Sequence, residues 1–195
     1  RMDGSTVAIP MARAFARQHL GLEDGELTSF VQFTTTHDAY VNLIEQKHHN
    51  YAYFLDSDRP RMDVGAPVDF IIATEPSNEE LALAEENGVK LHLQPVCCDA
   101  FIFIVHGSNP VDSITIQQLQ DIYTGRITNW KQLGGEDLPI RPFQREQNSG
   151  SQTAMEQLVM QGESMMEADT EKIVMGMGPL IDVVQQYDNG YGSIG

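Results

Sequence analysis

Apolar residues recur along the chain in two alternating patterns. Apolar positions three or four residues apart predict amphipathic helices, and short, nearly continuous apolar runs predict buried strands. Helices are expected over residues 10–20, 39–44, 77–87, 115–124, 149–159 and 179–187, and strands over residues 68–73, 91–96, 100–105, 139–143 and from 191 onward. Because the two kinds of element alternate, the pattern predicts an α/β protein with a largely parallel sheet.

Two of the expected helices share a start signal. Ser77 and Thr115 are each followed three positions later by a residue that can complete a capping box, Glu80 and Gln118 respectively. Gly88 follows the first of these helices and can end it. Residues 48–67 fit neither pattern and are expected to form an inserted loop.

The charge of the chain restricts its partners. The formal net charge is −16, which excludes duplex nucleic acid, since a duplex-binding protein needs a basic face. It equally disfavours direct binding to an anionic membrane surface, and no apolar run approaches the ~18 residues of a membrane span. A small anion remains possible, because charge repulsion in solution is screened over ~8–10 Å.

Signals for enzymes and metal sites are weak. The two cysteines, Cys97 and Cys98, are adjacent, a spacing that opposes a disulfide, and we expect them to be buried thiols in a strand. No Cys/His metal spacing, HExxH pattern, GxSxG turn or Walker loop occurs. We therefore expect no catalytic residues, no metal and no cofactor, and a phosphate-ester hydrolase is disfavoured.

Three expected helix starts are rich in small hydroxyl residues: 3–6, 34–36 and 148–151. A helix N-terminus attracts anions through its unpaired N–H groups, although Ser and Thr more often serve there simply as N-caps. Three such starts, each after a strand-like segment, favour a shared anion pocket at the carboxyl ends of the strands. Arg145 can grip an oxyanion in bidentate fashion or form an ordinary surface ion pair, and its type alone does not decide between them.

Four segments together resemble a known family. They are DGST at 3–6, ATEPSNEEL at 73–81, SNPVDSITIQQLQDIYTGRITNWKQLGG at 108–135 and QREQNSGSQTAMEQL at 144–158. They look like the phosphate-binding proteins of ABC importers, in the type 2 periplasmic-binding-protein superfamily. The resemblance implies two α/β lobes that close over an anion. It also implies truncation at both ends: lobe 1, residues 1–105, lacks its first strand and C-terminal return, and lobe 2 comprises residues 106–195.

The resemblance also implies the ligand-binding residues, which come from both lobes. They are Ser5, Thr6, Val7, Thr36, His37, Thr74, Arg145, Gln147, Ser149, Gly150 and Ser151. Two positions depart from the family pattern, in which an Asp lies near Thr74 and another takes the place of Gln147. Such a carboxylate accepts the proton of protonated phosphate and repels sulfate. Here Glu75, Glu146 or Asp3 would have to take that role.

The function implied is binding of phosphate or a similar tetrahedral oxyanion and its delivery to the membrane permease of an ABC importer. The resemblance further implies an extracytoplasmic monomer, a lipoprotein anchored by lipid in its full-length form. An alternative is an anion-sensing or adhesion module that uses the same fold within a larger surface protein, because fold alone does not determine function.

Overall fold

The computed structural model describes residues 2–31, 33–46, 67–168, 173–174, 177–186 and 192–195. The expected inserted loop at 48–67 therefore lies, except for Pro67, outside the described residues. The chain divides into two compact units, residues 1–95 and 96–195. The sequence placed this division later, after Val105, whereas in the structure residues 96–105 belong to the second unit.

The first unit is built on a short parallel sheet. Strand β1 (Met2–Gly4) pairs with β2 (Phe70–Ile72), in a register that places Gly4 opposite Ile72. A Cβ atom on Gly4 would lie 2.2 Å from the Ile72 carbonyl oxygen, so the close approach of the two strands requires glycine there. The side chains of β2 alternate between the two faces of the sheet, as the strand period demands.

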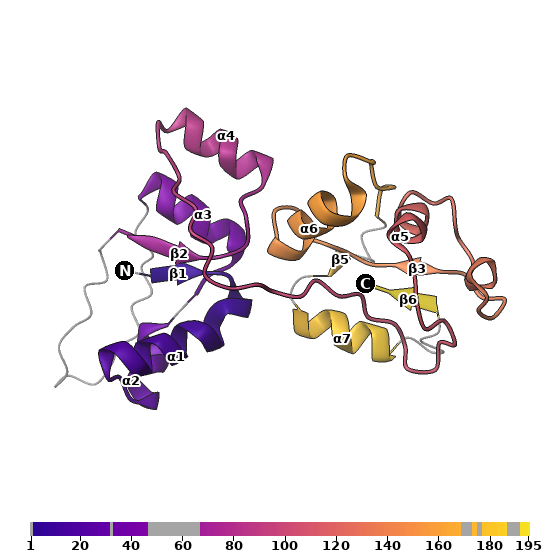
Figure 1. Ribbon diagram of the computed structural model, residues 1–195, viewed down its shortest axis with the longest axis horizontal. Coiled ribbons are helices and arrows are strands. Elements are labelled where there is room, and N and C mark those ends of the chain that lie inside the picture. Colours follow the sequence, from indigo (N-terminus) through magenta and orange to yellow (C-terminus); the bar gives the residue numbers. More distant parts are fainter. Residues whose placement is uncertain (1, 32, 47–66, 169–172, 175–176, 187–191) are drawn as a thin grey trace. The chain divides into compact units, whose positions relative to one another are not determined.

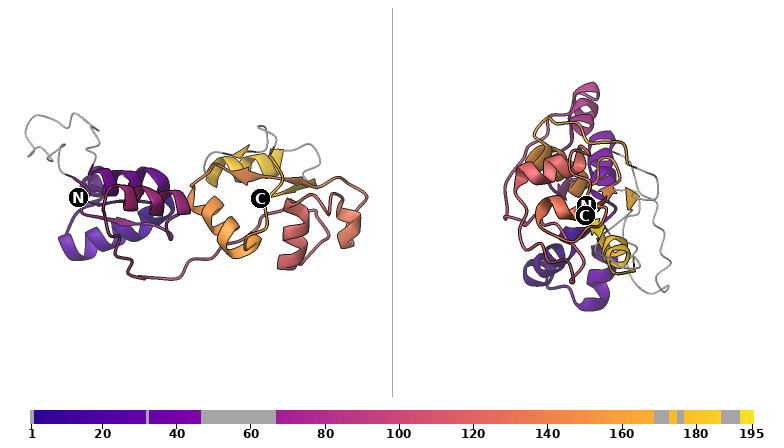
Figure 2. Two further views of the ribbon diagram at one scale, coloured as in Figure 1. Left: turned by 90° about the horizontal axis from the view of Figure 1, so that it is seen from above. Right: turned by 90° about the vertical axis from the view of Figure 1, so that its right-hand side faces the viewer.

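Two pairs of helices cover the two faces of this sheet (Figures 1 and 2). Helices α1 (Ile9–Leu20) and α2 (Asp24–Phe30) form one core with Ile72, and helices α3 (Thr36–Glu45) and α4 (Asn78–Glu86) form the other with Ile71. The buried residues of the first core are Met2, Ala12, Ala16, Leu27 and Val31; those of the second are Tyr40, Ile44 and Ala84. The unit is thus a small parallel sheet with helices on both faces, as the alternation of helix and strand patterns in the sequence predicted.

Local sequence signals are reproduced in this unit with one omission. The capping box predicted at Ser77 is present: Glu80 N–H donates to the Ser77 hydroxyl at 3.2 Å, and Ser77 N–H donates to Glu80 Oε2 at 2.8 Å. Helix α2 was not predicted, although Glu23 and Glu26 form a capping box at its start. Glutamate is an unusual N-cap, so the sequence gives only a weak start signal for this helix.

The two apolar runs at 91–96 and 100–105 do not form the predicted strands. Among the described residues, the strand-like pairings of this segment are those of Ile104 with Gly195 and of Val105 with Ile194, and Val96 and Ile102 are 71% and 68% exposed. A run of apolar residues forms a strand only where another strand offers backbone partners, which periodicity does not reveal. For the same reason the expectation for the cysteines is wrong: Cys97 and Cys98 are exposed and lie outside any strand.

The second unit contains two short parallel strand pairs. Strand β3 (Arg141–Pro142) pairs with β6 (Ser193–Ile194), and β4 (Gln144–Arg145) pairs with β5 (Ile173–Val174). The helical segments of this unit are α5 (Ile116–Tyr123), η2 (Trp130–Leu133), α6 (Gly150–Ala154), the π-helical η3 (Met155–Met160) and α7 (Met177–Gln186). The capping box predicted at Thr115 is present, with Gln118 as its second member.

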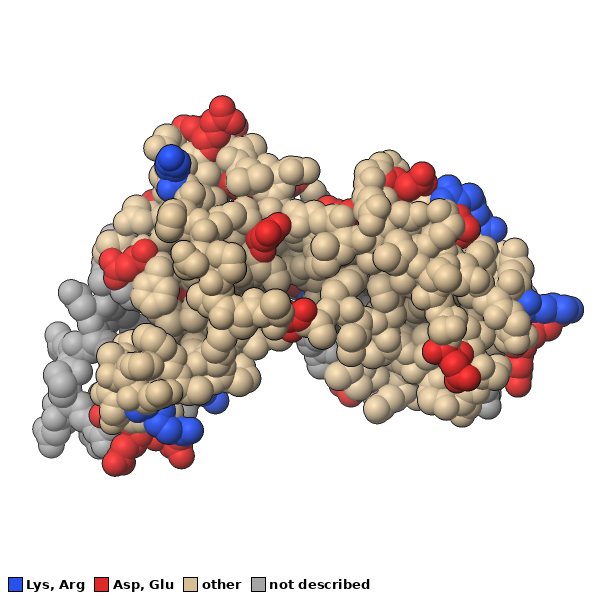
Figure 3. All heavy atoms as spheres, viewed as in Figure 1, with Lys and Arg blue, Asp and Glu red and all other residues tan. Residues whose placement is uncertain are grey.

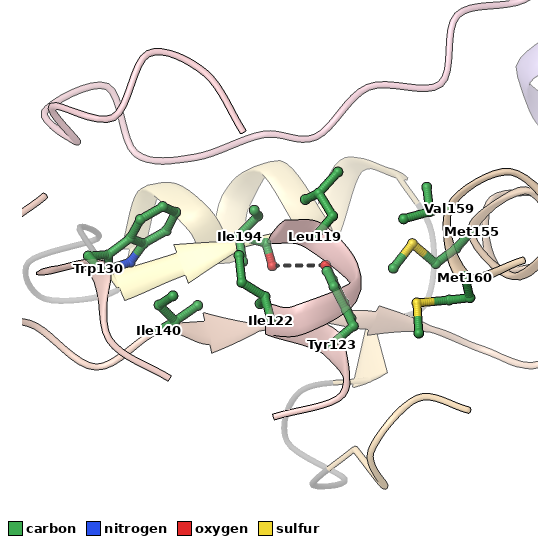
Figure 4. Packing of buried hydrophobic residues seen from close by; sticks show 9 residues of the cluster. All are labelled: Leu119, Ile122, Tyr123, Trp130, Ile140, Met155, Val159, Met160 and Ile194. Atoms are coloured by element: carbon green, nitrogen blue, oxygen red, sulfur yellow. Dashed lines mark hydrogen bonds between the residues drawn. The ribbon is translucent and has the colours of Figure 1, made fainter. Parts of the chain in front are cut away.

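The core of the second unit surrounds Tyr123 and Trp130, which are 2% and 1% exposed (Figure 4). The Tyr123 hydroxyl donates to the carbonyl oxygens of Phe143 (3.1 Å) and Ile194 (3.5 Å), so this core side chain holds two strand regions together. The other buried members of the cluster are Leu119, Ile122, Ile140, Met155, Val159, Met160 and Ile194. In the described ranges, no helix is both long and apolar enough to span a bilayer.

Candidate functional site

In the first unit, three of the predicted segments meet at one edge of the sheet. Ser5 follows β1, Thr74 follows β2, and Thr34 N–H donates to Asp3 at the end of β1 (2.9 Å), which brings the start of α3 to the same edge. This is the carboxyl end of both parallel strands, where ligands of α/β proteins usually bind. Two of the three helix starts predicted to share a pocket, 3–6 and 34–36, therefore lie at one edge of this sheet, and the third, 148–151, belongs to the second unit.

The first loop presents two exposed residues. Ser5 is buried, and its N–H donates to the Ile72 carbonyl at 2.9 Å, so this amide is already used by the fold. Thr6 and Val7 are exposed and open the short 3-10 helix η1 (Thr6–Ala8), which leads into α1. The Thr6 hydroxyl and the first N–H groups of this turn are therefore the accessible donors of the loop.

Asp3 lies beneath this loop as a buried anchor. Asp3 is only 1% exposed. Its carboxylate accepts hydrogen bonds from the N–H of Gly4 (2.8 Å), the N–H and hydroxyl of Thr34 (2.9 and 3.0 Å) and the Asn42 amide (3.1 Å). These donors come from β1, the loop before α3 and α3 itself. The carboxylate is thus occupied in holding the start of α3, and a role as ligand-proton acceptor does not fit its geometry.

Helix α3 begins earlier than predicted. The Thr35 hydroxyl is its N-cap and accepts from Asp38 N–H at 3.1 Å, so Thr36 and His37 lie in the first helical turn instead of preceding it. Thr36 is buried, and the His37 side chain is 41% exposed. Thr35 is therefore the N-cap, and Thr36 and His37 are the first two residues of α3 at its N-terminal end.

A second polar network joins α3 to the loop before α4. His37 Nδ1 lies 3.0 Å from Glu80 Oε1, and the Tyr40 hydroxyl donates to the Thr74 carbonyl at 2.7 Å. Burial first, and then the charges of Glu80 and Glu75, raise the pKa of Tyr40. The sequence predicted only a capping role for Glu80 and did not predict its contact with His37, because nothing in the local pattern links α3 with α4.

Thr74 itself carries an unmet hydrogen-bonding group. Its Oγ1 is buried and has no partner within the described part of the chain. Buried hydroxyls are almost always hydrogen-bonded, so such a group in a predicted ligand position is consistent with a donor for a bound molecule.

In the second unit, Arg145 lies over the start of α6. The backbone N–H of Arg145 donates to Gln152 Oε1 at 3.1 Å and so connects β4 with the helix. The guanidinium Nη1 of Arg145 lies 3.5 Å from the Ser151 hydroxyl. The side chain is 13% exposed, and its ion pair with Glu146 is long, at 3.7 Å. Burial lowers the pKa of Arg145, an effect that Glu146 opposes.

The turn between β4 and α6 brings the remaining predicted residues together. Asn148 adopts a left-handed conformation (φ 61°), which asparagine tolerates, and Ser149 caps α6 by accepting from Gln152 N–H at 3.2 Å. Gly150 and Ser151 form the first turn of the helix, where N–H groups have no intrahelical acceptor. Gln147 is exposed on the turn.

The predicted site residues therefore fall into two groups, one in each unit. Each group combines hydroxyl and N–H donors at a helix start, and the second adds a guanidinium. Over the described ranges no three His, Cys, Asp or Glu side chains gather as a metal site would require. The chemistry available is hydrogen-bond donation to an anion.

Comparison with known proteins places the chain in a family. The model of the PBP superfamily domain matches residues 24–194, which is most of the chain. The protein belongs to the PBP superfamily. Its similarity to individual relatives is partial: it is 39% identical over 62 residues to the phosphate-binding protein PstS of Borreliella burgdorferi, and 28% identical over 102 residues to PstS of Bacillus subtilis. These matches cover 32% and 51% of this chain, but only 22% and 34% of the two relatives.

Solved structures with a similar fold confirm the fold class. The whole chain aligns with 68% of a structure assigned as a phosphate ABC transporter substrate-binding protein with bound phosphate, from Clostridium perfringens (TM-score 0.60, 24% identity). It also aligns with 68% of an ABC-type phosphate transport receptor from Vibrio cholerae (TM-score 0.52, 20% identity). The predicted type 2 periplasmic-binding-protein fold is therefore confirmed.

Proposed function

We propose that this PBP protein binds phosphate or a similar tetrahedral oxyanion outside the cytoplasm and delivers it to the permease of an ABC importer. The proposal includes a monomeric, lipid-anchored full-length protein that binds its ligand without chemical conversion. The residues proposed to bind the anion are those predicted from the sequence. The observation that carries the proposal is the arrangement of Arg145 over the first turn of α6.

Arg145 has the properties of a ligand-binding cation. Its side chain is 13% exposed, whereas Arg17 and Arg126, which also form ion pairs, are 61% and 49% exposed. A guanidinium withdrawn from water beside a helix start offers donors and positive potential in one place. A tetrahedral oxyanion matches this arrangement, because its oxygens can accept from the guanidinium fork and from N–H groups together.

The net charge of −16 does not oppose this proposal. Acidic side chains are scattered over the face drawn in Figure 3, and basic ones are fewer. Their long-range repulsion is screened by salt, whereas hydrogen bonds at the site act at contact distance. The named relatives support phosphate over other oxyanions, since each is a phosphate-binding or phosphate-transport protein.

Calorimetric titration of the full-length protein with phosphate, sulfate, molybdate and tungstate tests the proposal. We expect phosphate to bind, and Arg145→Ala to weaken binding about 10- to 100-fold, because a charge-assisted hydrogen bond contributes about 1.5–3 kcal/mol. Ser151→Ala should weaken it only about fivefold, as a neutral hydrogen bond contributes ~1 kcal/mol. Arg13→Ala is the matched control, since it removes an exposed arginine from α1. Failure of all four anions to bind a folded protein, or equal weakening by Arg13→Ala and Arg145→Ala, would overturn it.

A further inference from the structure

Arg145 is held through its backbone as well as through its side chain. Its guanidinium lies 3.5 Å from the Ser151 hydroxyl and 3.7 Å from the Glu146 carboxylate. Both distances are long for a hydrogen bond, so neither of these two contacts fixes the direction of the side chain closely. The hydrogen bond of 3.1 Å from the Arg145 backbone N–H to Gln152 Oε1 holds the residue at its Cα end. The place of the guanidinium over α6 therefore depends in part on Gln152.

Gln152 is a buried residue whose side-chain amide is bonded at both ends. It is 6% exposed, and its own N–H donates to the Ser149 hydroxyl at 3.2 Å. Its Oε1 accepts from Arg145, and its Nε2 donates to Glu156 Oε1 at 3.3 Å. A backbone N–H requires an oxygen acceptor, so the amide cannot rotate without losing both bonds. Gln152 thus links the N-cap of α6 to the last residue of β4.

The helix that carries Gln152 is anchored in the core of the second unit. The π-helical η3 follows α6 directly, and its residues Met155, Val159 and Met160 are buried in that core (Figure 4). Gln120 of α5 also donates to the Val159 carbonyl at 2.8 Å. Because core packing and this bond hold the helix, the contact made by Gln152 positions β4 against a fixed support.

From this geometry we infer that Gln152 is a positioning residue for anion binding: its amide oxygen sets Arg145 in place beside the N–H and hydroxyl donors of Gly150 and Ser151. This inference rests on the proposed function, since it assigns a supporting residue to the same group of donors. Gln152 acts through Arg145 and not as a ligand, because both ends of its amide are bonded within the protein.

Phosphate titrations of the full-length protein, with Arg145→Ala introduced into each background, test this inference. In the wild type, Arg145→Ala should weaken phosphate binding about 10- to 100-fold. Gln152→Met keeps a side chain of similar length without its hydrogen-bonding ends, and should weaken binding about fivefold. It should also reduce the Arg145→Ala factor by the same amount, because a poorly placed guanidinium contributes less to binding. A purely structural role would lower stability in both backgrounds and leave that factor unchanged.

Further variants separate the two contacts of the amide. Gln152→Glu retains an acceptor for the Arg145 N–H, so the Arg145→Ala factor should be at least as large as in the wild type. Glu156→Ala removes the other partner of the amide, and Gln157→Met alters an exposed glutamine of the same helical segment. Both should leave phosphate affinity within about twofold, as exposed substitutions usually do. If Gln152→Met does not fold, Gln152→Asn, whose side chain is shorter, gives the same comparison.

Two results would show that the inference is wrong. The first is that Gln152→Met binds phosphate as tightly as the wild type, or that Arg145→Ala costs the same factor in both backgrounds. The second is an equal loss in Glu156→Ala and Gln152→Met, because the effect would then come from the contact with Glu156. A wild type that binds no phosphate would instead refute the proposed function, so the two failures are distinguishable.

Discussion

Replacing Asp3 should unfold the first unit at lower denaturant concentration, because its carboxylate is the common acceptor for three separate segments. In Asp3→Ala the N–H groups of Gly4 and Thr34 and the amide of Asn42 lose that acceptor inside the fold. A buried donor left without a partner costs about 1–3 kcal/mol, which gives an upper figure of about 9 kcal/mol for three. Entry of water and release of the buried charge reduce the expected loss to about 3–5 kcal/mol.

The amide in Asp3→Asn separates hydrogen bonding from charge. Its carbonyl oxygen can still accept from the Gly4 and Thr34 N–H groups, and Asn42 can turn its amide to meet the new NH2 group. We therefore expect a loss of only about 1–2 kcal/mol, mainly the difference between charged and neutral acceptors. If Asn is as damaging as Ala, the negative charge itself, and not the set of donors, stabilises this loop.

Urea unfolding followed by two probes measures these effects. Far-UV circular dichroism follows the whole chain, whereas the fluorescence of Trp130, the single tryptophan, reports on the core of the second unit. The matched control is Asp99→Ala, since Asp99 also accepts from the next N–H in the chain (2.8 Å) but is exposed. The account of Asp3 as an anchor fails if Asp3→Ala lowers the free energy of unfolding no more than Asp99→Ala does.

Two other predictions follow from local geometry. Gly4→Ala places a Cβ 2.2 Å from the Ile72 carbonyl oxygen and should destabilise the β1–β2 pair by more than about 2 kcal/mol. Its control is Gly25→Ala in α2, where no atom lies within 4 Å of the new Cβ; this variant should be neutral or stabilised by up to about 1 kcal/mol. Comparable urea midpoints for the two variants would contradict this prediction. The hydrogen bond from Arg126 holds the folded-state pKa of Asp121 below the ordinary aspartate pKa. The stability that this carboxylate contributes is therefore present above the ordinary pKa and is lost as the pH falls through the folded-state pKa. Asp121→Asn should therefore flatten the acid limb of the stability–pH curve at and below the ordinary aspartate pKa of about 3.9, and an unchanged curve would show that the pair contributes nothing.

The local features of this protein were determined by the sequence alone. The capping boxes of α4 and α5 each involve residues three positions apart, and their side chains reach the backbone whatever the rest of the chain does. The alternation of helix and strand patterns indicated an α/β fold, and the family motifs led to the PBP superfamily and to the group of donors around Arg145. That group was predictable because Arg145, Ser149 and Ser151 lie within one strand–turn–helix segment.

Only the tertiary structure decided which residues support the site from a distance. Asp3 meets Thr34 and Asn42 across 31 and 39 positions, and His37 meets Glu80 across 43. The tertiary structure also left the apolar runs at 91–96 and 100–105 largely without strand partners and exposed Cys97 and Cys98. Periodicity reports the conformation that a segment favours and the face that it buries, but it carries no information on which distant segment supplies the other half of a hydrogen bond. That partner is determined when the helices and strands pack, and so is the set of donors that occupies the Asp3 carboxylate.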